Sequence, residues 1–215
     1  GTFGLWEWAI NQNGTVANPT LGDPIPPNVI ITGFSNPTEL GTITVTTTDS
    51  GDHAVLGFFD LEILESTNTF YNEFGTATNP PAPGSTQSWE IDEPGWTFGD
   101  IYWNFEDSNE VVNSQLDNFN NVPSGLDDDV SMAMGWDFSL AAGQTSEISF
   151  AFSEIKPNGG FYLTQTDNIS DDKIYFTSTN TITGGGTDAV PIPSAVLLLG
   201  SGLVGLAGLR KKFVK

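Results

Sequence analysis

Most of the chain shows the alternation of apolar and polar residues that is typical of half-buried β-strands. Apolar side chains recur at every second position in residues 42–46, 55–64, 87–91, 97–105, 130–138, 148–152, 161–163 and 174–176. A period of two places the apolar side chains of each segment on one face of a strand. No window before Ser194 shows the 3.6-residue period of an amphipathic helix, so we expect an all-β body.

Proline and glycine clusters separate the predicted strands, at residues 24–27, 80–84, 93–95 and 157–160. Short strands with such turns favour an antiparallel β-sandwich, of jelly-roll or immunoglobulin-like type, over βαβ units. Residues 111–119 fit either a short helix or a strand. We assign residues 1–180 to a sandwich ectodomain, 181–189 to a glycine-rich linker and 190–215 to a separate C-terminal segment.

The C-terminal segment has a different pattern. Residues Ser194 to Leu209 form a run of 16 without any charge. The run follows Val190-Pro191-Ile192-Pro193 and ends in the basic residues Arg210, Lys211, Lys212 and Lys215. We expect a single hydrophobic helix of about 24 Å, which is marginal for a hydrocarbon core of ~30 Å. Small residues on one side of this helix, Ser201, Gly205 and Gly208, with Gly202 beside them, would let another helix approach closely.

The sequence of this tail resembles the PEP-CTERM class of bacterial sorting signals, in the variant that begins VPLPA. The matching residues are Val190, Pro191, Pro193, the run 197–203 and the run 205–210, whereas Ile192 and Ser194 depart from the motif. The resemblance implies export, transient anchoring in the inner membrane and processing by an exosortase-type transpeptidase of a Gram-negative envelope. Since such a tail acts after secretion, we interpret Gly1 as a mature N-terminus from which a signal peptide has been removed.

Charge separates the body from the tail. Before Val190, 27 acidic residues stand against only Lys156 and Lys173, which leaves a formal charge of −25. Such a surface repels nucleic acid and anionic lipid, because both need cations to replace their counterions. It favours solubility, divalent cations and basic partners. The chain has no cysteine, so its core must hold it without disulfides.

The densest acidic run, Asp127-Asp128-Asp129, is the candidate metal site, with Ca²⁺ as the ion and a solvated loop as the alternative. Calcium takes six to eight oxygen ligands, often from flexible loops. Asp167 with Asp171 and Asp172 is a second candidate cluster. Neither cluster has the spacing of an EF-hand. We expect no other cofactor.

Catalytic patterns are scarce. The single histidine, His53, reads as a surface turn residue, and no nucleophile elbow occurs in the chain. Glycoside hydrolysis needs only two carboxylates, for which the candidate region holds Asp92, Glu93, Trp96, Asp100 and Trp103. Each of these tryptophans also fits a strand or a turn, so we expect a protein without enzymatic activity.

The sequence therefore predicts a secreted structural or surface protein of the extracellular matrix or cell surface. Its predicted partners are an exosortase-type enzyme, the membrane through the tail, and other copies of itself, but not nucleic acid. One alternative is a filament subunit in which the tail or the strand Phe3 to Ile10 inserts into a neighbouring copy. Another is a carbohydrate-binding sandwich that uses exposed tryptophans.

Overall fold

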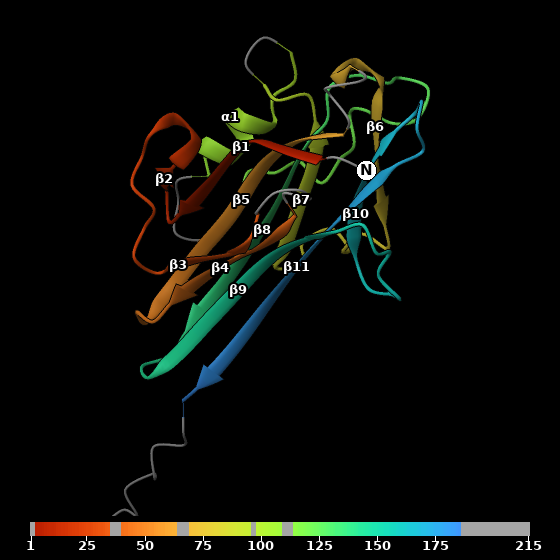
Figure 1. The fold of residues 1–215 in the computed structure, drawn as a ribbon. Coiled ribbons are helices and arrows are strands. Elements are labelled where there is room, and N and C mark those ends of the chain that lie inside the picture. Colours follow the sequence, from red (N-terminus) through yellow and green to blue (C-terminus); the bar gives the residue numbers. More distant parts are fainter. Residues whose placement is uncertain (1–2, 35–39, 64–68, 96–97, 109–113, 186–215) are drawn as a thin grey trace, which may run out of the picture. The chain divides into compact units, whose positions relative to one another are not determined.

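The computed structural model describes residues 3–34, 40–63, 69–95, 98–108 and 114–185 (Figure 1). The chain divides into two units, Gly1–Thr183 and Gly184–Lys215. Most of the described residues lie in strands of two largely antiparallel sheets, which confirms the prediction of an all-β body.

The first sheet has the order β2-β1-β5-β8-β7, and each neighbouring pair is antiparallel. Its strands are β1 (Phe3–Gln12), β2 (Thr15–Ala17), β5 (Gly51–Ile63), β7 (Gln87–Asp92) and β8 (Ser131–Leu140). A shift of register between Leu5 and Glu7 marks a β-bulge in β1, at the exposed Trp6.

The second sheet has the order β3-β4-β9-β11-β10-β6. Its strands are β3 (Val29–Gly33), β4 (Gly41–Thr47), β6 (Glu73–Thr78), β9 (Gln144–Ser153), β10 (Tyr162–Asp167) and β11 (Lys173–Gly184). Two short 3-10 helices, η1 (Pro19–Leu21) and η2 (Phe70–Asn72), lie in the connections.

Alternation along β5 divides its side chains between two cores. On one face, Phe59 meets the second sheet, and its ring centroid lies 4.7 Å from that of Phe152 and 5.2 Å from that of Phe176. On the other face, Phe58 belongs to a smaller core with Leu56 and Ala54. Because both faces are buried, β5 is apolar on both sides over much of its length.

The smaller core is covered by an α-helix, α1 (Ile101–Glu106), so the prediction of a strand over 97–105 and of no helix before Ser194 is wrong. Ile101, Tyr102 and Phe105 are buried, whereas Trp103 is 54% exposed. This stripe at positions i, i+1 and i+4 is helical, but alternate apolar residues at 101, 103 and 105 imitate a strand. The helical form is favoured because it places Tyr102 over the apolar side chain of Phe58. The ring centroids of Phe58 and Tyr102 are 5.2 Å apart.

His53 is not a surface turn residue, because it lies in β5 with only 5% of its surface exposed. Its Nε2 donates to the carbonyl oxygen of Asp49 at 2.8 Å, and its Nδ1 accepts from Asn13 Nδ2 at 3.2 Å. Its ring centroid is 5.4 Å from that of Phe138 on the paired strand β8. The histidine therefore ties together β5, β8 and the turn that follows β1.

The segment from Asp117 to Asp128 runs along the edges of β7 and β6 and bonds to both. Ile91 N donates to Phe119 O at 3.1 Å, and Gly75 N donates to Val122 O at 2.8 Å. These bonds satisfy edge groups that would otherwise offer a template for another chain. Of the ambiguous stretch 111–119, residues 114–119 thus form neither helix nor strand, and 111–113 lie outside the described residues.

Most of the predictions made for the C-terminal segment concern residues outside the described part of the chain. The expected hydrophobic helix, the sorting motif at 190–193, the small residues at 201–208 and the basic end all lie in residues 186–215. Strand β11 extends to Gly184 and so includes the first residues of the expected linker. In the part of the chain that is described, none of the helices has the length and apolar character of a membrane span.

Candidate functional site

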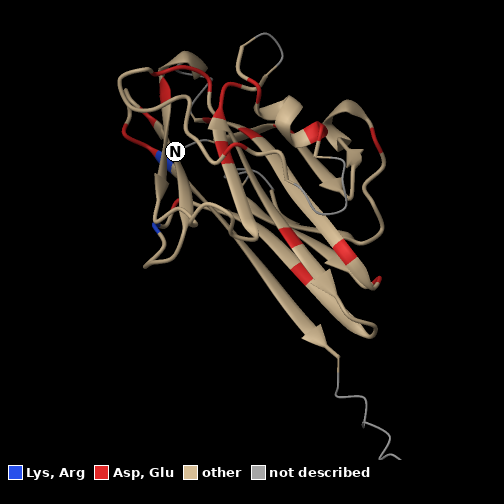
Figure 2. Cartoon of the chain, turned by 180° about the vertical axis from the view of Figure 1, so that it is seen from behind, with Lys and Arg blue, Asp and Glu red and all other residues tan. Residues whose placement is uncertain are grey.

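The predicted metal ligands Asp127 to Asp129 lie just before β8, and their carboxylates have different hydrogen-bond partners. Figure 2 shows acidic residues gathered at the end of the first unit that carries α1. Asp127 accepts hydrogen bonds from Gly125 N at 3.2 Å and from Asn168 Nδ2 at 2.6 Å. Asp128 accepts from the backbone N–H of Asp129 at 3.0 Å. The three aspartates therefore do not share one site.

Asp129 instead meets two carboxylates of β5. Oxygen atoms of Asp60, Glu62 and Asp129 all lie within 4.8 Å of one another, and Asp60 and Glu62 are buried. Burial raises the pKa of Asp60 well above its usual range, and the charges of Asp129 and Glu62 raise it further. A hydrogen bond from Ser131 Oγ at 3.2 Å acts in the opposite direction. Chemically, such a group can hold either protons or a divalent cation.

Glu73 is a second buried carboxyl group near this cluster. Its Oε1 accepts from Ile63 N at 2.9 Å, and its Oε2 accepts from Gln165 Nε2. Burial raises the pKa of Glu73 to about 8, although these hydrogen bonds lower it and the charges of Asp129 and Asp167 add to it. Glu73 thus joins β6 to the end of β5 in a form that holds its proton near neutral pH.

A third group of carboxylates, Glu90, Asp92 and Asp100, anchors α1. Glu90 accepts from Asn104 Nδ2 at 2.9 Å and from Asp117 N at 3.1 Å. Burial raises its pKa to about 8. Asp92 accepts from the backbone N–H groups of Glu93 and Asp100, at 2.9 and 2.8 Å. Of the candidate hydrolase carboxylates, the structure brings Asp92 and Asp100 together with Glu90, and the hydrogen bonds of Asp92 shape the turn before α1.

The aspartates of the second predicted calcium cluster bind to different partners within their own turn. Asp167 accepts from the backbone N–H groups of Ile169 and Ser170, each at 2.7 Å. Burial raises the pKa of Asp167, but these hydrogen bonds outweigh it and lower the pKa below its usual value. Asp171 forms an ion pair of 2.5 Å with Lys173. This turn is stabilised by its own bonds.

The tryptophans fall into two kinds. Trp8 and Trp89 belong to the main core, and Trp136 donates from Nε1 to Ser178 Oγ at 2.8 Å. Trp6 and Trp103 are exposed, at 63% and 54% of their surface, and Trp96 lies outside the described residues. Only Trp6 and Trp103, among the described tryptophans, present most of their surface to a ligand.

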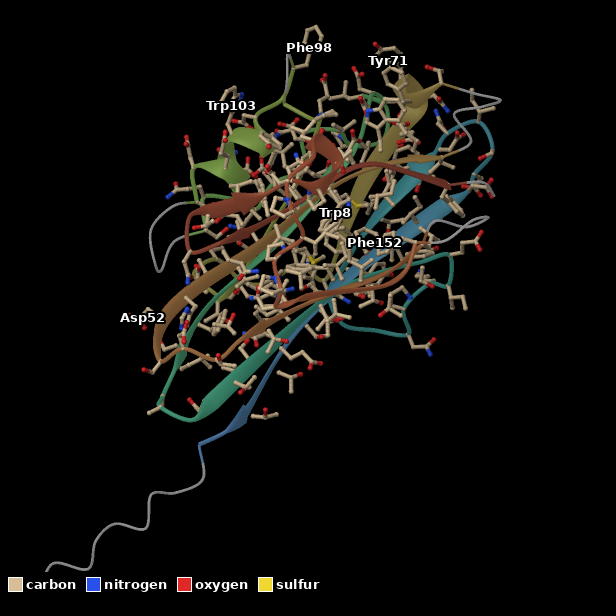
Figure 3. All side chains as sticks on the ribbon, turned by 60° about the vertical axis from the view of Figure 1, so that its left-hand side comes forward. Trp8, Asp52, Tyr71, Phe98, Trp103 and Phe152 are labelled. Carbon is tan, nitrogen blue, oxygen red and sulfur yellow. The ribbon has the colours of Figure 1, made fainter. Side chains whose placement is uncertain are left out.

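A groove of about 230 Å³ lies beside Asp129 at the same end of the unit, and we name it the aromatic–acidic groove. It is lined by Phe70, Tyr71, Glu93, Pro94, Gly95, Phe98 and Asp129. Figure 3 shows Tyr71 and Phe98 at this end; Tyr71 lies in η2 and Phe98 in the loop before α1, and their exposed fractions are 61% and 68%. Large exposed aromatic side chains around a hollow mark a binding surface more often than a structural one.

The turn between Glu93 and α1 depends on Gly99. Its φ is +73°, and a Cβ atom there would lie 2.5 Å from Glu93 O and 2.9 Å from Asp92 Oδ2. We expect Gly99→Ala to lower the free energy of unfolding by about 2–3 kcal/mol, through left-handed strain and the clash. Gly84→Ala is the control, since Gly84 has a φ of +81° and no atom near the added Cβ. Chemical denaturation of both variants should show the greater loss for Gly99→Ala, and equal losses would contradict the clash.

Sequence reasoning missed Asp60, Glu62, Glu73 and Glu90 as site residues. On a strand, carboxylates opposite an apolar face are expected to meet solvent. In β5, however, this face packs against Asp129 near Asp60 and Glu62, and against α1 near Phe58. Asp129 and α1 both come from segments distant in the sequence. In the sequence, the dense acidic run at 127–129 and the candidate region around Asp92 and Glu93 were the signals that pointed to this end of the first unit.

Comparison with protein-family models, with curated proteins and with solved structures gave no match for this chain. Function must therefore be argued from the residues and from their arrangement.

Proposed function

We propose that this chain is an exported, non-enzymatic β-sandwich protein of the cell surface or extracellular matrix, delivered by its C-terminal segment. The observation that carries the proposal is the segment 190–215, in which a proline-rich start, 16 uncharged residues and a basic end follow one another. These are the parts of a segment that is inserted in a membrane and then processed. Its partner is an exosortase-type transpeptidase.

The sandwich suits such a location. Two sheets enclose a single large apolar core, which stabilises the domain without disulfides. Its high negative charge keeps an exported domain dispersed. We also propose a jelly-roll or immunoglobulin-like class, because both sheet orders place strands that are distant in sequence side by side, as Greek-key connections do.

Intact mass measurement on exported material tests the proposal. We expect wild-type protein from the cell surface to lack the residues that follow the cut in the tail. A chain that ends at Ala189 should be exported but found free in the medium, since it has nothing to hold it in the membrane. Exported surface material that keeps all residues to Lys215 would contradict processing.

A filament subunit is the second candidate, and one observation favours it. Strand β3 stands at the end of the second sheet, and its Ile30 is 60% exposed. Beside it, a groove of about 400 Å³ is lined by Leu5, Trp8, Pro19, Thr20, Ile25, Ile31, Phe34 and Ile43. An edge strand next to an apolar groove can accept a strand from another copy. In the same mass experiment, an uncleaved tail in material that sediments as a polymer would favour this candidate.

A further inference from the structure

The aromatic–acidic groove combines two kinds of lining, aromatic rings and carboxylates. Its rings come from η2 and from the loop before α1, and the Phe70 and Tyr71 ring centroids are 4.1 Å apart. Its carboxylates are those of Glu93 and Asp129. The remaining lining residues, Pro94 and Gly95, bring no charged side chain.

Negative charge converges on this groove from outside its lining. After the effect of burial, the charges of Asp128 and Asp92 raise the pKa of Glu93. On the other side, oxygen atoms of the Asp129 and Glu62 carboxyl groups lie within 4.8 Å of each other. The groove is lined by no lysine or arginine among its described residues. A ligand that enters it therefore meets a negative potential, which attracts cations and repels anions.

The rings decide which kind of cation fits. Aromatic faces carry partial negative charge, and they attract ammonium and guanidinium groups while covering the apolar stems of these groups. A calcium ion requires six to eight oxygen ligands, whereas the described lining residues supply two carboxylates among rings, a proline and a glycine. A volume of about 230 Å³ suits a group the size of one side chain rather than a larger ligand.

We propose that the aromatic–acidic groove binds an organic cation, an ammonium or guanidinium group that carries an apolar stem. Glu93 and Asp129 supply the countercharge, and Tyr71 and Phe98 supply the ring faces. The proposal does not depend on the function of the tail, because every lining residue lies in the first unit. Loss of tail processing would leave it unchanged.

Calorimetric titration of the full chain tests this site with two probes at low ionic strength, choline chloride and arginine amide. We expect saturable binding of at least one probe, and none of citrulline amide, the uncharged isostere of arginine amide. Tighter binding of choline would indicate a free quaternary ammonium ligand. Tighter binding of arginine amide would indicate a basic side chain of a partner protein. Added salt should weaken either interaction.

Matched variants locate the binding. Tyr71→Ala and Phe98→Ala should each weaken the affinity by about threefold to thirtyfold, since each removes one ring face. Trp103→Ala is the control, because it removes another exposed aromatic side chain that is not part of the groove. Thermal melting should show that all three variants remain folded, as their side chains are exposed.

Several results would overturn the proposal. One is the absence of saturable binding by both cations, and another is unchanged affinity in the Tyr71→Ala, Phe98→Ala double variant. Binding of calcium chloride that is lost in Asp129→Asn but kept in the double variant, without organic-cation binding, would replace it with a divalent-metal site.

Discussion

Raising the pH from about 5 to about 8 is expected to lower the free energy of unfolding by several kcal/mol. The main cause is the burial of Glu73 and Glu90, which raises the pKa of each in the folded chain from 4.5 to about 8. In the unfolded chain, both groups lose their protons near pH 4.5. Between these values the folded state binds more protons than the unfolded state, so stability falls as the pH rises.

The contribution of these groups is fully present below pH 4.5 and is lost as the pH passes about 8. Each pKa shift corresponds to roughly 3–5 kcal/mol in the free energy of unfolding. No discount for solvent screening applies, because both side chains are fully buried. The neighbouring carboxylates act in the same direction, namely Asp129 and Asp167 on Glu73, and Asp117 and Asp100 on Glu90.

Urea unfolding measured across this pH range checks the expectation. The Glu73→Gln, Glu90→Gln double variant should show a much smaller slope of stability against pH, because its amides do not ionise. Glu106→Gln is the control for the loss of one negative charge at an exposed position, and it should keep the wild-type slope. Wild-type stability that stays constant or rises from pH 5 to 8 would refute the assignment.

Replacing Phe59 by alanine is expected to cost about 3–5 kcal/mol. Phe59 is fully buried between the two sheets, where its ring contacts those of Phe150, Phe152 and Phe176. The change removes the contacts through which β5 meets β9 and β11, and it leaves a cavity that a close-packed core cannot fill. Equilibrium unfolding at pH 5 is the measurement.

Phe119→Ala provides the comparison, because the Phe119 side chain is 59% exposed while its backbone bonds to β7. The variant keeps these backbone bonds and should lose less than about 0.5 kcal/mol, as surface substitutions usually do. Similar losses in the two variants would show that the sheets do not depend on the aromatic cluster.

The strands could be predicted because their apolar side chains follow a local period. Residues 130–138 alternate strictly, and β8 spans Ser131–Leu140. The helix α1 could not be predicted, since Ile101 and Phe105 satisfy both the helical and the strand period. The helix is favoured over a strand because Tyr102 packs against Phe58 of β5 and is therefore buried.

The candidate site was only partly visible in the sequence. The run Asp127 to Asp129 correctly indicated the end of the domain where the site lies. Of the three, however, only Asp129 lies close to buried carboxyl groups, those of Asp60 and Glu62 in β5. Likewise, Tyr71 and Phe98 line one groove although 27 positions separate them in the chain. Contacts of this kind depend on how strands pair, and no local pattern encodes them.

By itself, the sequence determined the all-β class, the positions of most strands, and the contrast between an acidic body and an apolar, basic-ended tail. These are properties of composition and of short periods, which each segment expresses independently of its neighbours. The tertiary structure alone decided which carboxylates are buried together, which face of β5 needs a helix, and where exposed rings meet negative charge. Those outcomes follow from the pairing of distant segments. The burial and the pKa of a side chain depend on strands and loops that are far from it in the sequence.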